Sequence, residues 1–190
     1  MQTIQESIEV DAPINTVYDQ WTQFEEFPQF MAGVEQVRQI DECRLHWVAQ
    51  VAGHRHEWDA EIYEQSPEQR IAWRSISGVR NDGEVQFERI SDQRTRVRVR
   101  INYEPQSALE KVGTALGVAS ARVKGDLKRF KEFIEARGTA SGAWHGEIHG
   151  AQTTRSDSTM ARSKRLHGEN AGAEQSSDVS ASGTSDPHMG

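Results

Sequence analysis

The chain has few of the features that stabilise or anchor a protein other than through a hydrophobic core. It has 190 residues and one cysteine, Cys43, so no disulfide can form within it. This favours a reducing, cytoplasmic location. No run of about 18 apolar residues occurs, which argues against a transmembrane segment. The first ten residues lack the basic and apolar regions of a secretory signal, so none is expected.

Positive charge is also scarce. The 22 Lys and Arg residues are outnumbered by 29 Asp and Glu, for a formal net charge of −7. Nucleic-acid phosphates require a basic surface, so we expect no nucleic-acid partner. Glycine-rich loops for phosphates or dinucleotides are missing, and so is a G-x-S-x-G nucleophile motif. The sequence therefore predicts no cofactor and no serine nucleophile, and it leaves the oligomeric state open.

Aromatic residues are confined almost entirely to the first 134 residues, and Trp144 is the only one beyond them. From residue 138 onward Ser, Thr, Gly, Ala and scattered charges dominate, and such a segment buries too little apolar surface to offset its ordering entropy. We therefore predict one domain over 1–137. An extension over 138–150 could dock through Trp144 and Ile148, and 151–190 should form a disordered, low-complexity tail.

Periodicity over residues 1–31 predicts one strand followed by helical segments. Residues 3–10 are expected to form an edge strand. A helix should follow Pro13, because a missing N–H costs nothing in a first helical turn. Residues 24–31 should be a short broken helix or a loop, since Pro28 disfavours helix at the residue before it. Core-facing residues repeat at helical spacing in the first helix: Ile14, Val17, Tyr18 and Trp21.

Alternating apolar and polar residues then predict six strands joined by short turns, at 34–40, 44–51, 54–63, 70–77, 84–90 and 95–103. Such a meander has one dry face and one wet face. Residues 106–137 carry one apolar stripe at spacings of three and four, typical of a long helix. These elements predict an α+β fold in which a curved antiparallel sheet wraps around the long C-terminal helix.

The hairpin between the last two strands has a predictable register. With a short loop at 91–93, Glu88 should pair with Arg96, Phe87 with Val97, and Glu84 with Arg100. A slip of one residue would place Glu88 opposite the inward-facing Val97, so the inward and outward alternation supports this register.

The candidate site is the dry face of the sheet and the helix opposite it. Two interpretations remain open: a ligand pocket walled by aromatic side chains, or an ordinary packed core. The inward aromatic residues are Trp21, Phe27, Phe30, Trp47, Trp58, Trp73, Phe87 and Tyr103. The facing helix should contribute Leu109, Val112 and Leu116, with Val123 as a further candidate.

Three polar side chains, those of His56, Ser75 and Ser77, are expected on the same dry face. Buried polar groups need hydrogen-bond partners, and a ligand or a neighbouring side chain could supply them. If the protein is an enzyme, His56 and Tyr103 are the candidates for transferring a proton. His54, His56 and Glu61 have part of a metal-ligand spacing, but Glu61 has the opposite strand parity, so we expect no metal site.

Four stretches together resemble a known superfamily: SIEVDAPINTVYDQWTQFEEFPQFMAGVEQV at 7–37, WDAEI at 58–62, QRIAWRS at 69–75 and RFKEFIEARG at 129–138. The chain is similar over about residues 2–137 to the START-type helix-grip (SRPBCC) proteins, whose bacterial members are described as polyketide cyclase/dehydrase or lipid-transport proteins. The resemblance implies an elongated internal cavity and no fixed catalytic residues.

Three functions are compatible with this resemblance, because a fold does not determine an activity. The first is a carrier or sensor that binds a small hydrophobic molecule such as a lipid, polyketide or quinone. The second is a polyketide cyclase or dehydratase acting in the same cavity. The third is an interaction protein whose interior is filled by its own side chains.

Overall fold

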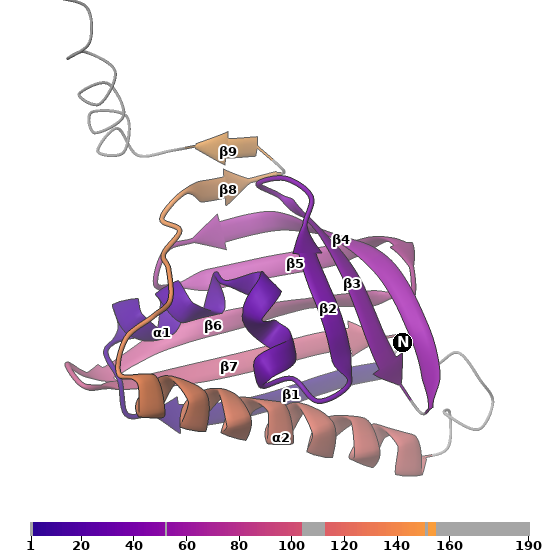
Figure 1. Ribbon diagram of the computed structural model, residues 1–190, viewed down its shortest axis with the longest axis horizontal. Coiled ribbons are helices and arrows are strands. Elements are labelled where there is room, and N and C mark those ends of the chain that lie inside the picture. The colour runs from indigo at the N-terminus through magenta and orange to yellow at the C-terminus, as the bar shows by residue number, and fades with distance from the viewer. Residues whose placement is uncertain (1, 52, 104–112, 151, 155–190) are drawn as a thin grey trace, which may run out of the picture. The chain divides into compact units, whose positions relative to one another are not determined.

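A computed structural model describes residues 2–51, 53–103, 113–150 and 152–154. Its strands form one antiparallel sheet in the spatial order β1-β7-β6-β5-β4-β3-β2, with β8 paired to β4 and β9 paired to β8 (Figure 1). The strand bounds are β1 Gln2–Val10, β2 Val34–Gln39, β3 Arg44–Val51, β4 His54–Ser66, β5 Arg70–Gly78, β6 Asn81–Ser91, β7 Arg94–Tyr103, β8 Glu147–His149 and β9 Gln152–Thr154.

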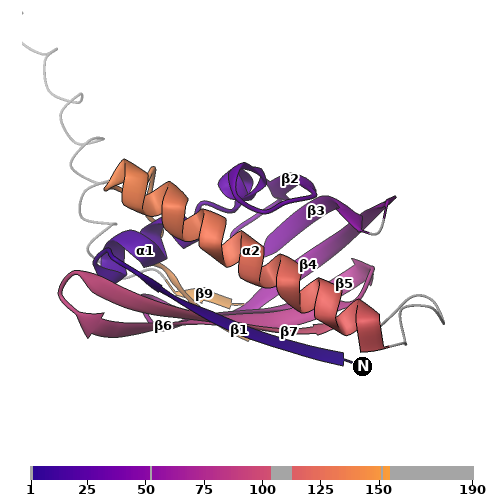
Figure 2. The ribbon, with the colours of Figure 1, turned by 90° about the horizontal axis from the view of Figure 1, so that it is seen from below.

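Three helical segments accompany the sheet. Helix α1 (Ile14–Trp21) and the 3-10 helix η1 (Phe24–Gln29) connect β1 to β2, and the long helix α2 (Gly113–Arg137) follows the strands. Figure 2 shows α2 lying across the open face of the curled sheet. The predicted α+β helix-grip architecture is confirmed. The first part of the expected helix, 106–112, lies outside the described residues, together with Leu109 and Val112.

The predicted register between β6 and β7 is confirmed. Glu88 pairs with Arg96, and the two other predicted pairs are also present. The turn is tighter than expected, since Ser91 pairs with Arg94 and an irregularity precedes it at residue 90. Arg96 bridges Glu88 at 3.2 Å and Glu9 at 2.7 Å, so opposite charges on three neighbouring strands meet on the outer face.

Two irregularities in the pairing of β4 with β5 change which side chains face inward. Ala60 pairs with Ser75 while Asp59 pairs with Ser77, so Ile76 is an extra residue and the alternation reverses there. The expectation that Ser77 faces inward is therefore wrong: Ser77 is exposed and its hydroxyl donates to Asp59 at 2.8 Å. A bulge reverses alternation because side chains in a strand have a period of two.

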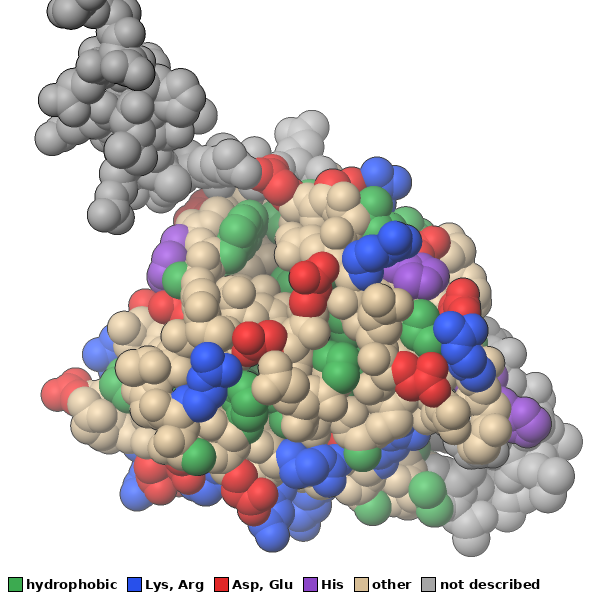
Figure 3. All heavy atoms as spheres, in the orientation of Figure 1, with side chains coloured by type: hydrophobic (Ala, Val, Ile, Leu, Met, Phe, Trp, Pro, Cys, Tyr) green, Lys and Arg blue, Asp and Glu red, His purple; other side chains and the backbone are tan. Residues whose placement is uncertain are grey.

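The closed end of the half-barrel is a packed aromatic core. The second irregularity, at residue 63, turns Gln65 inward, where its Nε2 donates to the hydroxyl of Tyr18 at 2.9 Å. Phe87 contacts Tyr18 and Trp21 edge to face, at ring-centroid distances of 5.4 and 6.0 Å. In Figure 3 charged side chains of both signs are interspersed with apolar ones on the visible face, and the large aromatic cluster lies inside.

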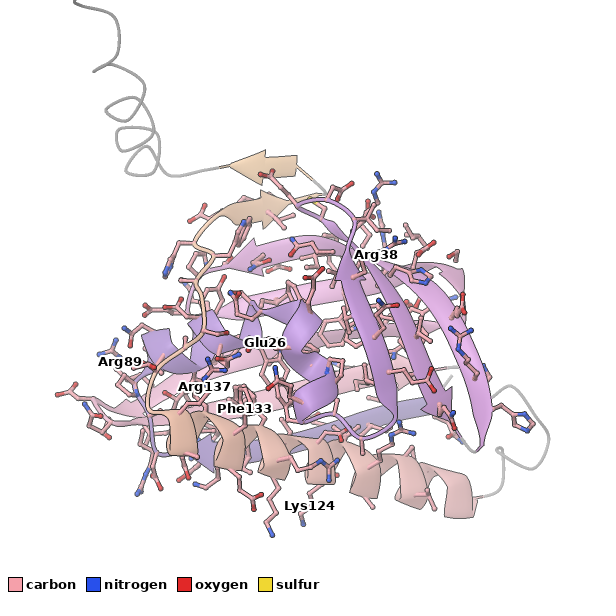
Figure 4. All side chains as sticks on the ribbon, viewed as in Figure 1. Glu26, Arg38, Arg89, Lys124, Phe133 and Arg137 are labelled. Atoms are coloured by element: carbon pink, nitrogen blue, oxygen red, sulfur yellow. The ribbon has the colours of Figure 1, made fainter. Side chains whose placement is uncertain are left out.

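The segment after α2 packs back onto the domain. Figure 4 shows Arg137 beside Glu26 and Phe133; its guanidinium lies 3.5 Å from the Glu26 carboxylate. The amide of Ser141 donates to the side chain of Gln20 at 3.1 Å. Further on, Ile148 is fully buried. Residues 138–149 thus contribute side chains to the core as well as covering it.

The tail was expected to lack regular structure from residue 151 onward. The structure instead places residues 152–154 in strand β9, which pairs with β8. The physical reason is that β4 extends to Ser66 and offers a backbone edge to β8 at Glu64 and Gln65. Once β8 is held, it presents its own free edge to β9. The remaining residues of the predicted tail, 155–190, lie outside the described part of the chain.

Candidate ligand-binding cavity

A cavity of about 560 Å³ lies between the concave face of the sheet and α2. This volume is within the range that small-molecule sites usually occupy. Side chains from β1, α1, η1, all the central strands and α2 line it. The apolar lining includes Ile4, Trp21, Phe24, Phe27, Phe30, Met31, Val34, Leu45, Trp47, Trp58, Ile62, Ile71, Trp73, Val99, Ile101, Val123, Leu127 and Phe130.

Aromatic rings form a flat wall on the sheet side of the cavity. Trp47 and Trp58 are directly paired across β3 and β4, and their rings stack at 5.6 Å with an interplanar angle of 9°. Phe27 packs edge-on against Trp47 at 5.7 Å. Trp73 sits opposite Gly83, where an added Cβ would approach its ring to 2.6 Å. Glycine at position 83 therefore leaves room for the Trp73 indole in the cavity wall.

Three polar lining residues, His56, Arg80 and Asn81, come from the end of the sheet at which β4 and β6 begin. Asn81 pairs with Tyr103 and Trp58 with Gly78, so the start of β6, the end of β5 and the start of β4 meet at this end of the sheet. The Arg80 guanidinium is paired with Asp82 at 3.0 Å. Among the described residues, neither the half-buried His56 ring nor the Asn81 side-chain amide has a hydrogen-bond partner, and the Asn81 Oδ1 is buried.

A buried amide oxygen without a donor costs about 1–3 kcal/mol. The backbone of Asn81 is nevertheless held firmly, because its N–H donates to the hydroxyl of Ser75 at 2.8 Å and its carbonyl accepts from that hydroxyl at 3.1 Å. The main chain of Ser75 in turn donates to Asp82 at 2.9 Å. This network keeps the Asn81 side chain on the cavity wall, although the side chain itself gains no partner from it.

Along the seam between α2 and β2, three helix residues hold the turn that follows η1. We call this contact the clasp: Arg122, Asp126 and Arg129 bound to the turn at residues 30–33. The Asp126 carboxylate accepts from the Ala32 N–H at 2.8 Å, and Arg129 Nε donates to the Phe30 carbonyl at 2.9 Å. Arg122 donates to the carbonyls of Ala32 and Gln50.

The clasp places a carboxylate on the cavity wall. Burial raises the pKa of Asp126 above its usual value, although the Ala32 N–H and the neighbouring Arg129 and Arg122 guanidinium groups oppose that rise. Its side chain is only 15% exposed and bonds Arg129 as well as Ala32. Both charged residues that α2 contributes to the lining, Arg122 and Asp126, are thus engaged with protein atoms.

The structure brings together seven of the residues predicted for the site. All seven line the cavity: Trp21, Phe27, Phe30, Trp47, His56, Trp58 and Trp73.

Three other predicted residues, Ser75, Phe87 and Leu116, do not line it. Ser75 uses its hydroxyl to brace Asn81, and Phe87 is packed under α1. Leu116 is half-buried on α2 outside the lining, whereas Ala119 and Val123 line it. Tyr103 ends β7, but its side chain, like Leu109 and Val112, lies outside the described residues.

Sequence reasoning missed the polar residues Asn81, Arg122 and Asp126. Asn81 was assigned to a turn, yet the inward alternation of Phe87 and Val85 extends back through Gly83 to Asn81 and would have placed it inside. Arg122 and Asp126 carried no comparable signal, because charged helix residues are normally assigned to solvent.

Among the residues that the structure describes, no three His, Cys, Asp or Glu side chains converge as metal ligands would. Within the same ranges, no helix has the length and hydropathy needed to cross a membrane.

Comparison with known proteins relates the chain to one protein family. Residues 10–132 match the family model described as "Polyketide cyclase / dehydrase and lipid transport". A protein of Streptomyces lincolnensis, described as an uncharacterized 17.2 kDa protein, is 48% identical over 149 residues, which cover 78% of this chain and 99% of the relative.

Solved structures share the fold at low sequence identity. A START superfamily protein from Mycobacterium smegmatis superposes with a TM-score of 0.65 at 13% identity, covering 71% of this chain and 98% of its own. The Zhui aromatase/cyclase from a Streptomyces species gives 0.63 at 17% identity, covering 75% and 99%. At such identities the likeness concerns the fold alone.

Proposed function

Because the chain belongs to the polyketide cyclase/dehydrase and lipid-transport family, we propose that it binds a small hydrophobic molecule and carries or senses it without transforming it. The molecule would be a lipid, a polyketide or a quinone. The observation that carries this proposal is the cavity of about 560 Å³, walled by aromatic and aliphatic side chains from both the sheet and α2. A cytoplasmic location is part of the proposal.

The energetics favour an apolar ligand. Each Å² of apolar surface removed from water contributes about 25 cal/mol, and the stacked Trp47 and Trp58 rings offer a flat surface for it. An interior filled only by its own side chains, the third function considered from the sequence, is disfavoured by the size of the cavity, since native cores rarely leave voids larger than a water molecule.

A cyclase or dehydratase remains the second candidate, because the His56 ring lines the cavity without a partner among the described residues. General acid–base catalysis benefits from titratable groups that converge on the substrate. Asp126 is the one carboxyl group among the described lining residues, and it is held by Ala32 and Arg129 in the clasp. With that carboxylate committed elsewhere, the binding function is the better supported of the two.

Native mass spectrometry of the protein purified from its own host tests the proposal directly. We expect a small molecule to co-purify and to be released unchanged on denaturation. A second measurement uses Nile red, an uncharged apolar dye whose emission rises in apolar surroundings. Wild type should bind it, Trp73→Ala should alter the affinity, and Trp144→Ala should leave it unchanged, because Trp144 does not line the cavity. Failure of wild type to bind any apolar molecule would contradict the proposal.

A further inference from the structure

The cavity has hydrogen-bonding capacity at one end that the protein does not use. A neutral imidazole offers one donor and one acceptor, and a primary amide offers two donors and an acceptor. Neither the ring of His56 nor the side-chain amide of Asn81 bonds any described residue. Both side chains lie where β4 and β6 begin, at the same end of the sheet. A ligand that filled the cavity with hydrocarbon alone would leave these groups unsatisfied.

The charged side chains of the lining, in contrast, already bond protein atoms. Arg80 is paired with Asp82 at 3.0 Å. Arg122 donates to two backbone carbonyls, and Asp126 accepts from Ala32 and Arg129. An ionised ligand would have to share a partner with one of these groups or remain unpaired, and burying an unpaired charge is strongly unfavourable.

From these two observations we infer that His56 and Asn81 form a recognition pair, two separate hydrogen-bonding positions on the cavity wall for uncharged polar groups, hydroxyls or carbonyls, of an otherwise apolar ligand. This inference rests on the proposed function and narrows it. The ligand would be a neutral molecule with its oxygen at the His56 end and its ring system against Trp47 and Trp58. An ionised carboxylate or phosphate head group would be disfavoured, because both arginines of the described lining, Arg80 and Arg122, already donate to protein oxygen atoms.

A matched series of ligands tests the inference. Naphthalene, 2-methoxynaphthalene, 2-naphthol and 2-naphthoate share one ring system and differ only in the polar group. Their affinities can be measured by displacement of Nile red in neutral buffer, where the naphthol is uncharged and the naphthoate is ionised. A single neutral hydrogen bond should make 2-naphthol bind about three- to tenfold more tightly than naphthalene. The naphthoate should bind more weakly than the naphthol.

Three variants assign the preference to particular residues. Asn81→Leu and His56→Phe each remove hydrogen bonding while keeping a side chain of similar size, and each should reduce the ratio of naphthol affinity to naphthalene affinity measured on the same variant. Ser77→Ala is the control, because it removes a hydroxyl from the outer face of the same sheet. Using two independent variants keeps the test informative even when one of them folds poorly.

The outcomes separate this inference from the proposed function. Equal affinity for all four compounds, or a naphthol preference that persists in both variants, would overturn the recognition pair while leaving a ligand cavity in place. Tighter binding of the naphthoate than of the naphthol would also overturn it, and would show that Arg80 or Arg122 reads an anion. Binding of none of the four compounds would overturn the inference and the proposed function together.

Discussion

Gly33 provides the sharpest test of the clasp between α2 and the turn after η1. Its φ of +79° lies in the left-handed region, and a Cβ added there would lie 2.1 Å from Arg122 Nη2 and 2.8 Å from the Gln50 carbonyl oxygen. Gly53 has nearly the same φ, +81°, but an added Cβ would meet nothing within 4 Å. The two glycines therefore share a backbone penalty and differ only in what surrounds the new methyl group.

The expected losses follow from these two environments. Left-handed backbone costs a residue with a Cβ about 1–2 kcal/mol, so Gly53→Ala should lower the free energy of unfolding by that amount. Gly33→Ala adds the displacement of Arg122 from the Ala32 and Gln50 carbonyls. Hydrogen bonds to charged groups contribute about 1.5–3 kcal/mol, and the lower end applies because Arg122 is partly exposed. The total for Gly33→Ala is then about 3 kcal/mol.

Urea unfolding followed by tryptophan fluorescence measures both losses by linear extrapolation. The entropy that alanine removes from the unfolded chain is common to both variants and cancels in the comparison. In an Arg122→Ala background, Gly33→Ala should no longer cost the hydrogen bonds of Arg122, whereas the left-handed backbone and the close approach to the Gln50 carbonyl oxygen remain, and a double-mutant cycle would show this coupling. Equal losses for Gly33→Ala and Gly53→Ala, or no coupling to Arg122, would refute the clasp as a stabilising contact.

Three further outcomes are expected. Trp73→Ala should lower the free energy of unfolding by less than the roughly 3–5 kcal/mol expected for truncating a fully packed tryptophan, because it enlarges an existing cavity. A loss in that full range, measured by urea unfolding, would contradict this expectation. Ile148→Ala should cost about 2–4 kcal/mol, since its side chain is fully buried, and a loss under 1 kcal/mol would mean that β8 is only loosely attached. Burial raises the pKa of Tyr18 from 10.0 to about 12. The neutral side chain therefore stabilises the fold fully below pH 10.0, and this contribution is lost as the pH rises toward 12. The free energy of unfolding measured against pH should show this loss in wild type and not in Tyr18→Phe.

The local sequence pattern was sufficient to predict the secondary-structure elements and most of the cavity wall. The alternation along β3 and β4 placed Trp47, His56 and Trp58 on one face, and the structure lines the cavity with all three. Charge complementarity gave the register of β6 and β7, since only one parity brings Glu88 opposite Arg96. These inferences succeed because side-chain direction in a regular strand depends on nothing beyond residue parity.

Residue parity no longer predicts which face a side chain occupies once a strand contains an extra residue. The irregularities at Tyr63 and Ile76 turned Gln65 inward and Ser77 outward. Neither position carries a glycine or another local mark of a bulge. Sheet twist and the curvature needed to wrap around α2 determine where an extra residue is accommodated, and these are properties of the whole sheet.

The sequence by itself determined the fold class, the order of the elements and the apolar character of the interior, because each depends on periodicity within a short window. Only the tertiary structure decided that Asn81, Arg122 and Asp126 enter the cavity, and which of the polar side chains there bond other protein atoms. Arg122 and Asp126 hold the turn after η1, whereas the side chains of His56 and Asn81 bond no described residue. That distinction arises from contacts between segments about 70 to 94 residues apart, whose geometry no local pattern encodes.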